Sequence, residues 1–270
     1  MNIANLNNII RGYIYFILSV INKLFFFRLA SNQVFILCYH SIASDTWRYG
    51  VSLKTFEKQL IYLKEKYQPL TLSDVENIIK NEKRITKPSF VLTFDDGYKD
   101  ILLARKIVRK LGIKPTFFIL SDAEHANMTE LGTSRAFLSR KDIATLLQDG
   151  WILGSHGATH ADFWNLSEKA MQKEIKDSRE ILRKKYNVPV DYFAYPKGRY
   201  TKRTIQAVID AGYHMALSMD DAYITRKTPL LLVPRVGVDR SHTLQEFRSI
   251  ILSSSISFRA CIKKLGGFTQ

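Results

Sequence analysis

The segment Phe90-Val91-Leu92-Thr93-Phe94-Asp95-Asp96-Gly97 joins a short apolar run to two adjacent carboxylates and a glycine. The run has the length and composition of a buried strand, and the polar triplet follows its carboxyl end. Two neighbouring ionised carboxylates repel each other and are costly to desolvate, so such a pair usually shares a metal ion or a proton. Asp-Asp-Gly is also ordinary turn chemistry, and Asp96 is a suitable N-cap for a helix that begins near Tyr98. The segment alone leaves both interpretations open.

Strand-like and helix-like stretches alternate along the chain after residue 33. The predicted strands are Val34–Tyr39, Phe90–Phe94, Thr116–Leu120, Trp151–Gly154, Tyr192–Tyr195, His214–Leu217 and Leu231–Val236. The predicted helices are Leu53–Lys66, Leu72–Lys80, Lys99–Leu111, Ser139–Gln148, Ser167–Tyr186 and Lys202–Ala211. This alternation predicts an α/β fold with a parallel sheet, an irregular (β/α)7-type barrel in which reactive groups lie at the carboxyl ends of the strands.

Length and composition are consistent with a single catalytic domain. A chain of 270 residues with 46% apolar content can bury one large core. Its 40 basic and 25 acidic residues give a net charge of +15, which implies attraction to nucleic acid, anionic lipid or acidic glycan. The basic residues are scattered along helices without a nucleic-acid motif, so we expect no nucleic-acid partner. We divide the chain into an N-terminal helix (1–32), a catalytic domain (33–245) and a basic C-terminal tail, helix or loop (246–270).

Residues 9–29 are largely apolar and carry a localisation signal. Arg11, Asn22, Lys23 and Arg28 interrupt this segment and leave 12–21 as the longest charge-free stretch before Asn22, which is shorter than the ~20 residues that cross hydrocarbon. On a helix the polar residues gather on one side, and these are Asn8, Arg11, Tyr15, Ser19, Asn22 and Lys23. This pattern predicts a helix lying in an anionic membrane surface, on an undefined side. The alternatives are an uncleaved anchor, a helix packed on the core and a cleaved signal ending near Ala30-Ser31, against which the missing small-x-small pattern counts.

Polar residues follow most of the predicted strands. They are His40, Asp95-Asp96, His156 and His160, Pro196-Lys197-Gly198, and Arg235 in the last strand. The H-x-x-x-H spacing lets both imidazoles reach one ion across a turn-like step, and Asp96 completes a set of three ligands. The same segment, 155–160, is also ordinary loop composition. Agreement between two separate segments at one barrel mouth favours a catalytic divalent metal site. Cys38 and Cys261 have no zinc-ligand spacing.

The motifs T-F-D-D-G at 93–97 and S-H-G-A-T-H at 155–160 resemble, in order and separation, the polysaccharide deacetylase family, the NodB-homology domain of carbohydrate esterase family 4. The resemblance implies Asp95 as the catalytic base. It implies that Asp96, His156 and His160 bind a divalent metal, with zinc as the first choice and nickel, cobalt or manganese as alternatives.

The segment F-A-Y-P-K-G at 193–198 is similar to the third motif of that family, R-x-P-aromatic-G. The resemblance implies that Tyr195, Pro196 and Lys197 form an oxyanion and substrate-binding turn, with the backbone N–H of Lys197 in the oxyanion hole. Ala194 stands where the motif has arginine. The arginine that normally orients the base is therefore missing from this position.

The segment L-C-Y-H-S-I at 37–42 resembles the circularly permuted branch of the family that deacetylates poly-N-acetylglucosamine. In that branch the general acid comes from an N-terminal Y-H-x-I segment, which implies His40; the alternative is a buried structural histidine. Arg235 is a candidate to replace the missing arginine beside Asp95, and the alternative is a strand-end arginine in solvent. The resemblance covers roughly residues 33–240.

The implied activity is that of a bacterial hydrolase acting on a carbon–nitrogen bond that is not a peptide bond. It would remove N-acetyl groups from an N-acetylhexosamine in a cell-surface polysaccharide or lipid-linked glycan, and the N-terminal helix predicts membrane association. A carbohydrate O-acetyl esterase is one alternative, because an alkoxide leaves more easily than an amine. A non-catalytic glycan-binding protein at the membrane surface is another, and the joint presence of the motif carboxylates and histidines argues against it. No oligomeric state is predicted.

Overall fold

The structure is a computed structural model of the 270-residue chain and describes residues 10, 12–18, 20, 33–81 and 84–264. Within these residues an eight-stranded parallel sheet has the order β10-β1-β5-β6-β7-β8-β9, with β4 also paired to β5. Its strands are β1 (Val34–Tyr39), β4 (Gln68–Leu70), β5 (Ser89–Phe94), β6 (Thr116–Ile119), β7 (Ile152–Ser155), β8 (Tyr192–Ala194), β9 (Met215–Leu217) and β10 (Val236–Gly237). The short strands β2 (Ser41–Ile42) and β3 (Gly50–Val51) pair separately.

Segment 233–237 connects β9, at one end of the sheet order, with β1 near the other end. Val233 pairs with Leu217 of β9, and Val236 of β10 pairs with Leu37 of β1. Pro234 lies between the two pairings and has no N–H to donate to a ladder, so the strand predicted at 231–236 is reduced to β10. The resulting curled parallel sheet confirms the predicted α/β barrel class.

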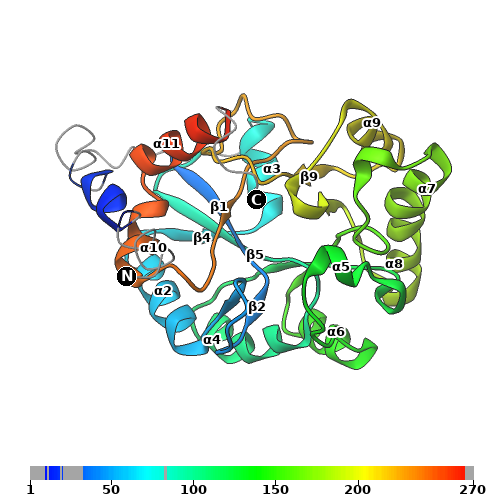
Figure 1. The fold of residues 1–270 in the computed structure, drawn as a ribbon, viewed down its shortest axis with the longest axis horizontal. Helices are drawn as coiled ribbons and strands as arrows, with labels where there is room; N and C mark the ends of the chain where they lie inside the picture. Colours follow the sequence, from blue (N-terminus) through cyan, green and yellow to red (C-terminus); the bar gives the residue numbers. More distant parts are fainter. Residues whose placement is uncertain (1–9, 11, 19, 21–32, 82–83, 265–270) are drawn as a thin grey trace.

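Helices surround the sheet (Figure 1). The α-helices are α2 (Leu53–Lys66), α3 (Leu72–Ile79), α4 (Arg105–Lys110), α5 (Met128–Leu131), α6 (Arg140–Gln148), α7 (Glu168–Gln172), α8 (Ser178–Tyr186), α9 (Lys202–Asp210), α10 (Leu244–Ile250) and α11 (Ser253–Lys264). The 3-10 turns are η1 (Lys99–Ala104), η2 (Ala123–His125), η3 (Phe163–Asn165) and η5 (Pro196–Gly198). Side-chain caps fix several helix starts, as where Ser139 and Asp142 form a capping box before α6.

The helix predicted at 167–186 is not regular. A π-helical turn, η4 (Lys173–Asp177), separates α7 from α8. Such turns insert one extra residue per turn and are frequent at functional sites. This turn buries both Glu174 and Ile175.

Strands β1 and β5 are buried on both faces, as expected for a parallel sheet covered by helices. Alternate residues enter different clusters: Phe35 and Leu37 pack in the larger core beneath the helices, whereas Val34 and Ile36 pack in a smaller cluster with Phe118. Period-two alternation assigns Cys38 and His40 to the same side as Val34 and Ile36. On this side of β1, the apolar residues Val34 and Ile36 are therefore followed by Cys38 and His40 at the carboxyl end of the strand.

One predicted domain boundary falls inside a helix of the structure. The boundary after residue 245 falls inside α10, and Phe247 and Ile250 of that helix are fully buried in the main core, so α10 is part of the packed domain. Most of the segment 1–32 lies outside the described residues, but residues 10, 12–18 and 20 are helical. Among the residues that the structure describes, no helix is long and apolar enough to cross a membrane.

Candidate active site

Two strand ends bring the three predicted ligands to one place. Asp96 follows β5, and His156 and His160 follow β7. Asp96 Oδ1 lies 3.3 Å from Nε2 of His156 and 3.6 Å from Nε2 of His160, and one candidate ligand atom from each residue lies within 4.8 Å of the others. All three side chains are buried. The structure thus brings together the three residues that the sequence grouped.

The donor set suits a metal ion. His156 Nδ1 lies 2.7 Å from the Ala194 carbonyl, and an N–H at Nδ1 leaves the lone pair of Nε2 directed at Asp96. Within the described part of the chain, the buried Oδ1 of Asp96 has no hydrogen-bond partner. Lone pairs that face one another in a buried site repel unless a cation lies between them. One carboxylate and two imidazoles are ligands for zinc and related divalent metals.

Charges within the site set the protonation of these ligands. Burial acts to raise the pKa of Asp96, but the adjacent imidazole of His156 and the charges of the nearby histidines outweigh burial and hold that pKa well below its usual range. Burial lowers the pKa of His160 to about 4, so this ring is neutral near pH 7. Burial also acts to lower the pKa of His156, but the charges of Asp95 and Asp96 raise it. The negative field that favours a proton on His156 also favours a metal cation.

The backbone around the ligands adopts unusual conformations. Asp96 and His160 have φ angles of 67° and 62°, in the left-handed region that residues with a side chain seldom adopt. Gly97 follows with φ 74°, and a Cβ there would lie 2.8 Å from the Ile119 side chain. Such strain is characteristic of functional sites that a rigid scaffold holds in place.

Asp95 forms a buried ion pair with Arg235. The guanidinium nitrogens donate to Oδ1 at 2.7 Å and to Oδ2 at 2.8 Å, and Arg235 is fully buried. Cys38 also donates to Oδ2, with Sγ at 3.3 Å. Burial acts to raise the pKa of Asp95, but the charge of Arg235 outweighs burial and the pKa is lowered. Arg235 therefore occupies the place beside Asp95 that the missing arginine of the third motif left open.

His40 lies beside the same carboxylate. Candidate ligand atoms of Cys38, His40 and Asp95 lie within 4.8 Å of one another. The His40 ring contacts Tyr49, with centroids 4.7 Å apart, and its buried Nδ1 has no hydrogen-bond partner among the described residues. Burial lowers the pKa of His40, partly opposed by the charges of Asp96 and Asp95.

The turn after β8 carries Tyr195, Pro196 and Lys197. The Gly198 N–H donates to the Tyr195 carbonyl at 2.7 Å, and Lys197 has a φ of 57°. The Tyr195 hydroxyl donates to the Leu231 carbonyl at 3.1 Å, which fixes a buried ring. The Lys197 ammonium forms an ion pair with Glu130, so this side chain is directed toward α5.

Glu174, a buried carboxylate in η4, is absent from the residues predicted for the site. Its Oε2 accepts the backbone N–H groups of Ala158 at 2.8 Å and Thr159 at 3.0 Å, and its Oε1 accepts the Thr159 hydroxyl at 2.6 Å. These bonds fix the loop between the two histidines. A charged residue on the otherwise apolar stripe formed by Met171, Ile175 and Leu182 is the signal that identifies it. Cys38 was also missed, because its strand reads as uniformly apolar.

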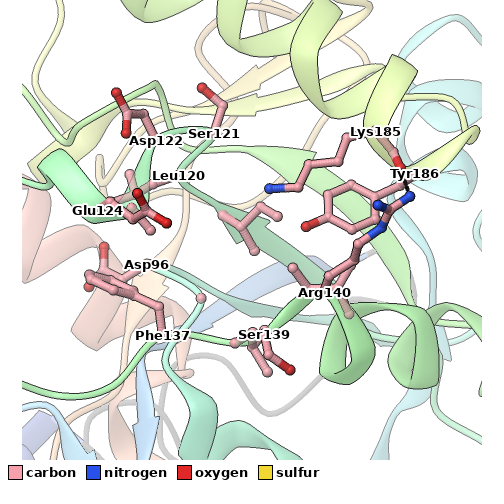
Figure 2. A pocket seen from close by; sticks show the side chains of 15 residues that line it. Asp96, Leu120, Ser121, Asp122, Glu124, Phe137, Ser139, Arg140, Lys185 and Tyr186 are labelled. Atoms are coloured by element: carbon pink, nitrogen blue, oxygen red, sulfur yellow. Dashed lines mark hydrogen bonds between the residues drawn. The ribbon is translucent and has the colours of Figure 1, made fainter.

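A cavity of about 550 Å³ opens beside Asp96 (Figure 2). Asp96 and Gly97 line one end, and Lys185 and Tyr186 line the other. In Figure 2 the Lys185 ammonium and the Tyr186 hydroxyl point toward the side that carries Glu124. Neither His156 nor His160 lines the cavity. Of the three candidate ligands, Asp96 is the one that borders it. Its volume and its mixed polar and apolar walls are typical of small-molecule sites.

Comparison with known families identifies polysaccharide deacetylase. The family model for polysaccharide deacetylase matches residues 82–216. Among curated proteins, "Putative polysaccharide deacetylase YxkH" of Bacillus subtilis (strain 168) is 27% identical over 220 residues, which cover 81% of this chain and 76% of that protein.

Solved structures share the fold. The Streptococcus pyogenes deacetylase PplD, solved in complex with acetate, has a TM-score of 0.70 and 25% sequence identity, and the match covers 81% of this chain and 98% of that one. IcaB from Ammonifex degensii has a TM-score of 0.69 at 20% identity, covering 83% of this chain and 97% of that one. The second likeness concerns the fold alone.

Proposed function

Because this chain belongs to the polysaccharide deacetylase family, we propose that it is a metal-dependent enzyme that removes N-acetyl groups from an N-acetylhexosamine-containing polysaccharide or lipid-linked glycan. The comparisons support a carbohydrate deacetylase, which is a hydrolase. Metal dependence, the N-acetyl bond and the roles of individual residues are the proposal.

One observation carries the proposal. Three buried candidate ligands, Asp96, His156 and His160, meet within 4.8 Å, directly beside a second carboxylate, Asp95, whose pKa is lowered by Arg235 against the effect of burial. A ligand group next to an ionised base is the arrangement that metal-assisted hydrolysis requires. A glycan-binding protein without catalysis has no need for it.

When bound by Asp96, His156 and His160, a divalent cation supplies Lewis acidity, which polarises an acetyl carbonyl and makes water more acidic. Asp95 accepts the proton of the attacking water. Its Oδ2 already accepts two hydrogen bonds, from Arg235 and Cys38, whereas Oδ1 accepts one from Arg235. A carboxylate oxygen has two lone pairs, so Oδ1 is the atom that takes the proton.

Two further groups serve the departure of the amine. His40, beside Asp95, acts in its protonated form: the imidazolium gives a proton to the leaving nitrogen and becomes neutral imidazole, because an unprotonated amide nitrogen is a poor leaving group. The backbone N–H of Lys197 donates to the developing oxyanion, a contribution whose loss typically costs about 10²-fold or more in rate. Tyr195 and Pro196 hold that turn. The products are acetate and a glycan in which the hexosamine residue carries a free amino group.

Acetate release from defined N-acetylglucosamine oligomers tests the proposal. We expect release that stops after chelation and returns with zinc, and parallel additions of nickel, cobalt and manganese rank the metals. Matched O-acetylated sugars test the esterase alternative: the N-deacetylase assignment requires that the N-acetyl substrates be preferred. Turnover that persists after complete removal of metal would refute the mechanism.

A further inference from the structure

The exposed side of the N-terminal helix (residues 10–20) is entirely apolar or aromatic among its described residues. Ile10, Tyr13, Phe16, Ile17 and Val20 are between 37% and 67% exposed. At about 100° per residue these five positions fall on one side of the helix. We name them the exposed stripe. Figure 1 shows the helix, in dark blue, at the outer edge of the molecule near α10 and α11.

The opposite side of this helix faces the protein. Tyr15 is 9% exposed and joins the main core, and Leu18 packs against the same cluster. The Leu18 carbonyl accepts a hydrogen bond from the Ser254 hydroxyl of α11 at 3.0 Å. Tyr15 belongs to the side that the sequence marks as polar, so among the described residues a member of that side faces the protein while the apolar exposed stripe faces outward. This is the reverse of an ordinary surface helix.

The net charge of the chain indicates which kind of partner covers the exposed stripe. The chain carries a net charge of +15, and Arg11, Lys23 and Arg28 stand within and after the helix in the sequence. A second copy of the chain carries the same charge and is repelled, whereas an anionic lipid surface is attracted. Exposed aliphatic and aromatic side chains insert at the level of the lipid headgroups. We propose that the exposed stripe docks this protein on an anionic bilayer, with the helix lying in the plane of the surface.

Sedimentation of the full chain with lipid vesicles tests this docking. The vesicles contain phosphatidylcholine alone or phosphatidylcholine with phosphatidylglycerol. We expect binding to the anionic vesicles and a loss of about tenfold or more in the double variant Phe16→Ser/Ile17→Ser, because two large apolar side chains no longer leave water. The matched control, Leu103→Ser/Ile181→Ser, removes side chains that are 53% and 45% exposed on other helices, and its binding should equal that of the wild type.

Thermal unfolding and light scattering accompany each variant. If the double variant does not fold, Tyr13→Ser replaces it, because that side chain is the most exposed of the stripe. The proposal is overturned if the wild type ignores anionic vesicles or if a folded stripe variant binds them as well as the wild type does. A dimer that depends on the stripe, without vesicle binding, would identify a second copy as the occupant and would also overturn it. None of these readouts depends on acetate release.

Discussion

Arg235 and Asp95 lie 140 residues apart in the sequence and form a fully buried two-pronged ion pair at the centre of the site. Arg235 is further held by its Nε bond to the Ser218 carbonyl and lies over the Phe118 ring. The pair keeps a carboxylate charged where water is scarce. A base so held is oriented as well as ionised.

Replacing Arg235 by Met should destabilise the protein by about 3–5 kcal/mol, because Asp95 would remain buried without its counter-charge. The rate of acetate release should also fall in this variant. Urea unfolding measures the first effect. The control is Arg105→Met, which breaks the partly exposed ion pair with Asp149 and should cost no more than about 1 kcal/mol. Equal losses for the two variants would contradict a special role for the buried pair.

The two adjacent aspartates should respond differently to removal of their charge. Asp95→Asn should retain metal and lose turnover by about 10²-fold or more, because only the proton acceptor is gone. Asp96→Asn should lose metal. Elemental analysis of the metal content, together with acetate release, separates the two effects. Loss of metal from both variants would show that the aspartates share one role.

Glu174→Gln should weaken metal affinity by about 10–100-fold, the usual cost of losing a group that orients ligands. The amide cannot match the three hydrogen bonds that the carboxylate accepts from Ala158 and Thr159, so the histidine loop loosens. Metal titration followed by a competing chelator measures the affinity. Glu180→Gln, on the exposed side of α8, is the control. Unchanged affinity in the Glu174 variant would mean that the loop is rigid without it.

The metal-free protein should lose stability as the pH falls from about 6.5 to about 4. His160 has a folded pKa of about 4 and an ordinary value of 6.5, so in this window the unfolded chain binds a proton that the folded chain does not. Its contribution is therefore complete above pH 6.5 and disappears as the pH falls through the window. Unfolding midpoints measured across this range should show a shallower slope in His160→Gln. A slope equal to that of the wild type would exclude His160 as the source.

The sequence was sufficient to group the three candidate ligands. It was insufficient to place the side chains that support them. Asp96, His156 and His160 follow predicted strands, and the rule that parallel strand ends share one edge brings them together. Arg235 was identifiable as a candidate because the third motif lacks its arginine at Ala194. Its contact with Asp95 required the pairing of Val233 with β9 and of Val236 with β1, which no local pattern specifies.

Glu174 and Cys38 show why the remainder was not predictable. Glu174 reaches the histidine loop through a π-helical turn, and composition does not predict where a helix changes its period. Cys38 looks like one more apolar strand residue until the fold brings Asp95, which follows the neighbouring strand, within hydrogen-bonding distance of its Sγ. The N-terminal helix was predicted as amphipathic. Which side it turns to the protein depends on contacts with α11, far along the chain.

The link that segment 233–237 makes between β9 and β1 has a consequence for biosynthesis. Chains emerge from the ribosome amino end first, and domains generally fold as units. Asp95, Asp96, His156 and His160 are all synthesised before residue 235, yet Asp95 gains its counter-charge only when Arg235 arrives and the last strand pairs with the first. A nascent chain that has not reached this point holds all three candidate ligands and no paired base. The paired carboxylate of the site is therefore complete only after residue 235 has been synthesised and β10 has paired with β1.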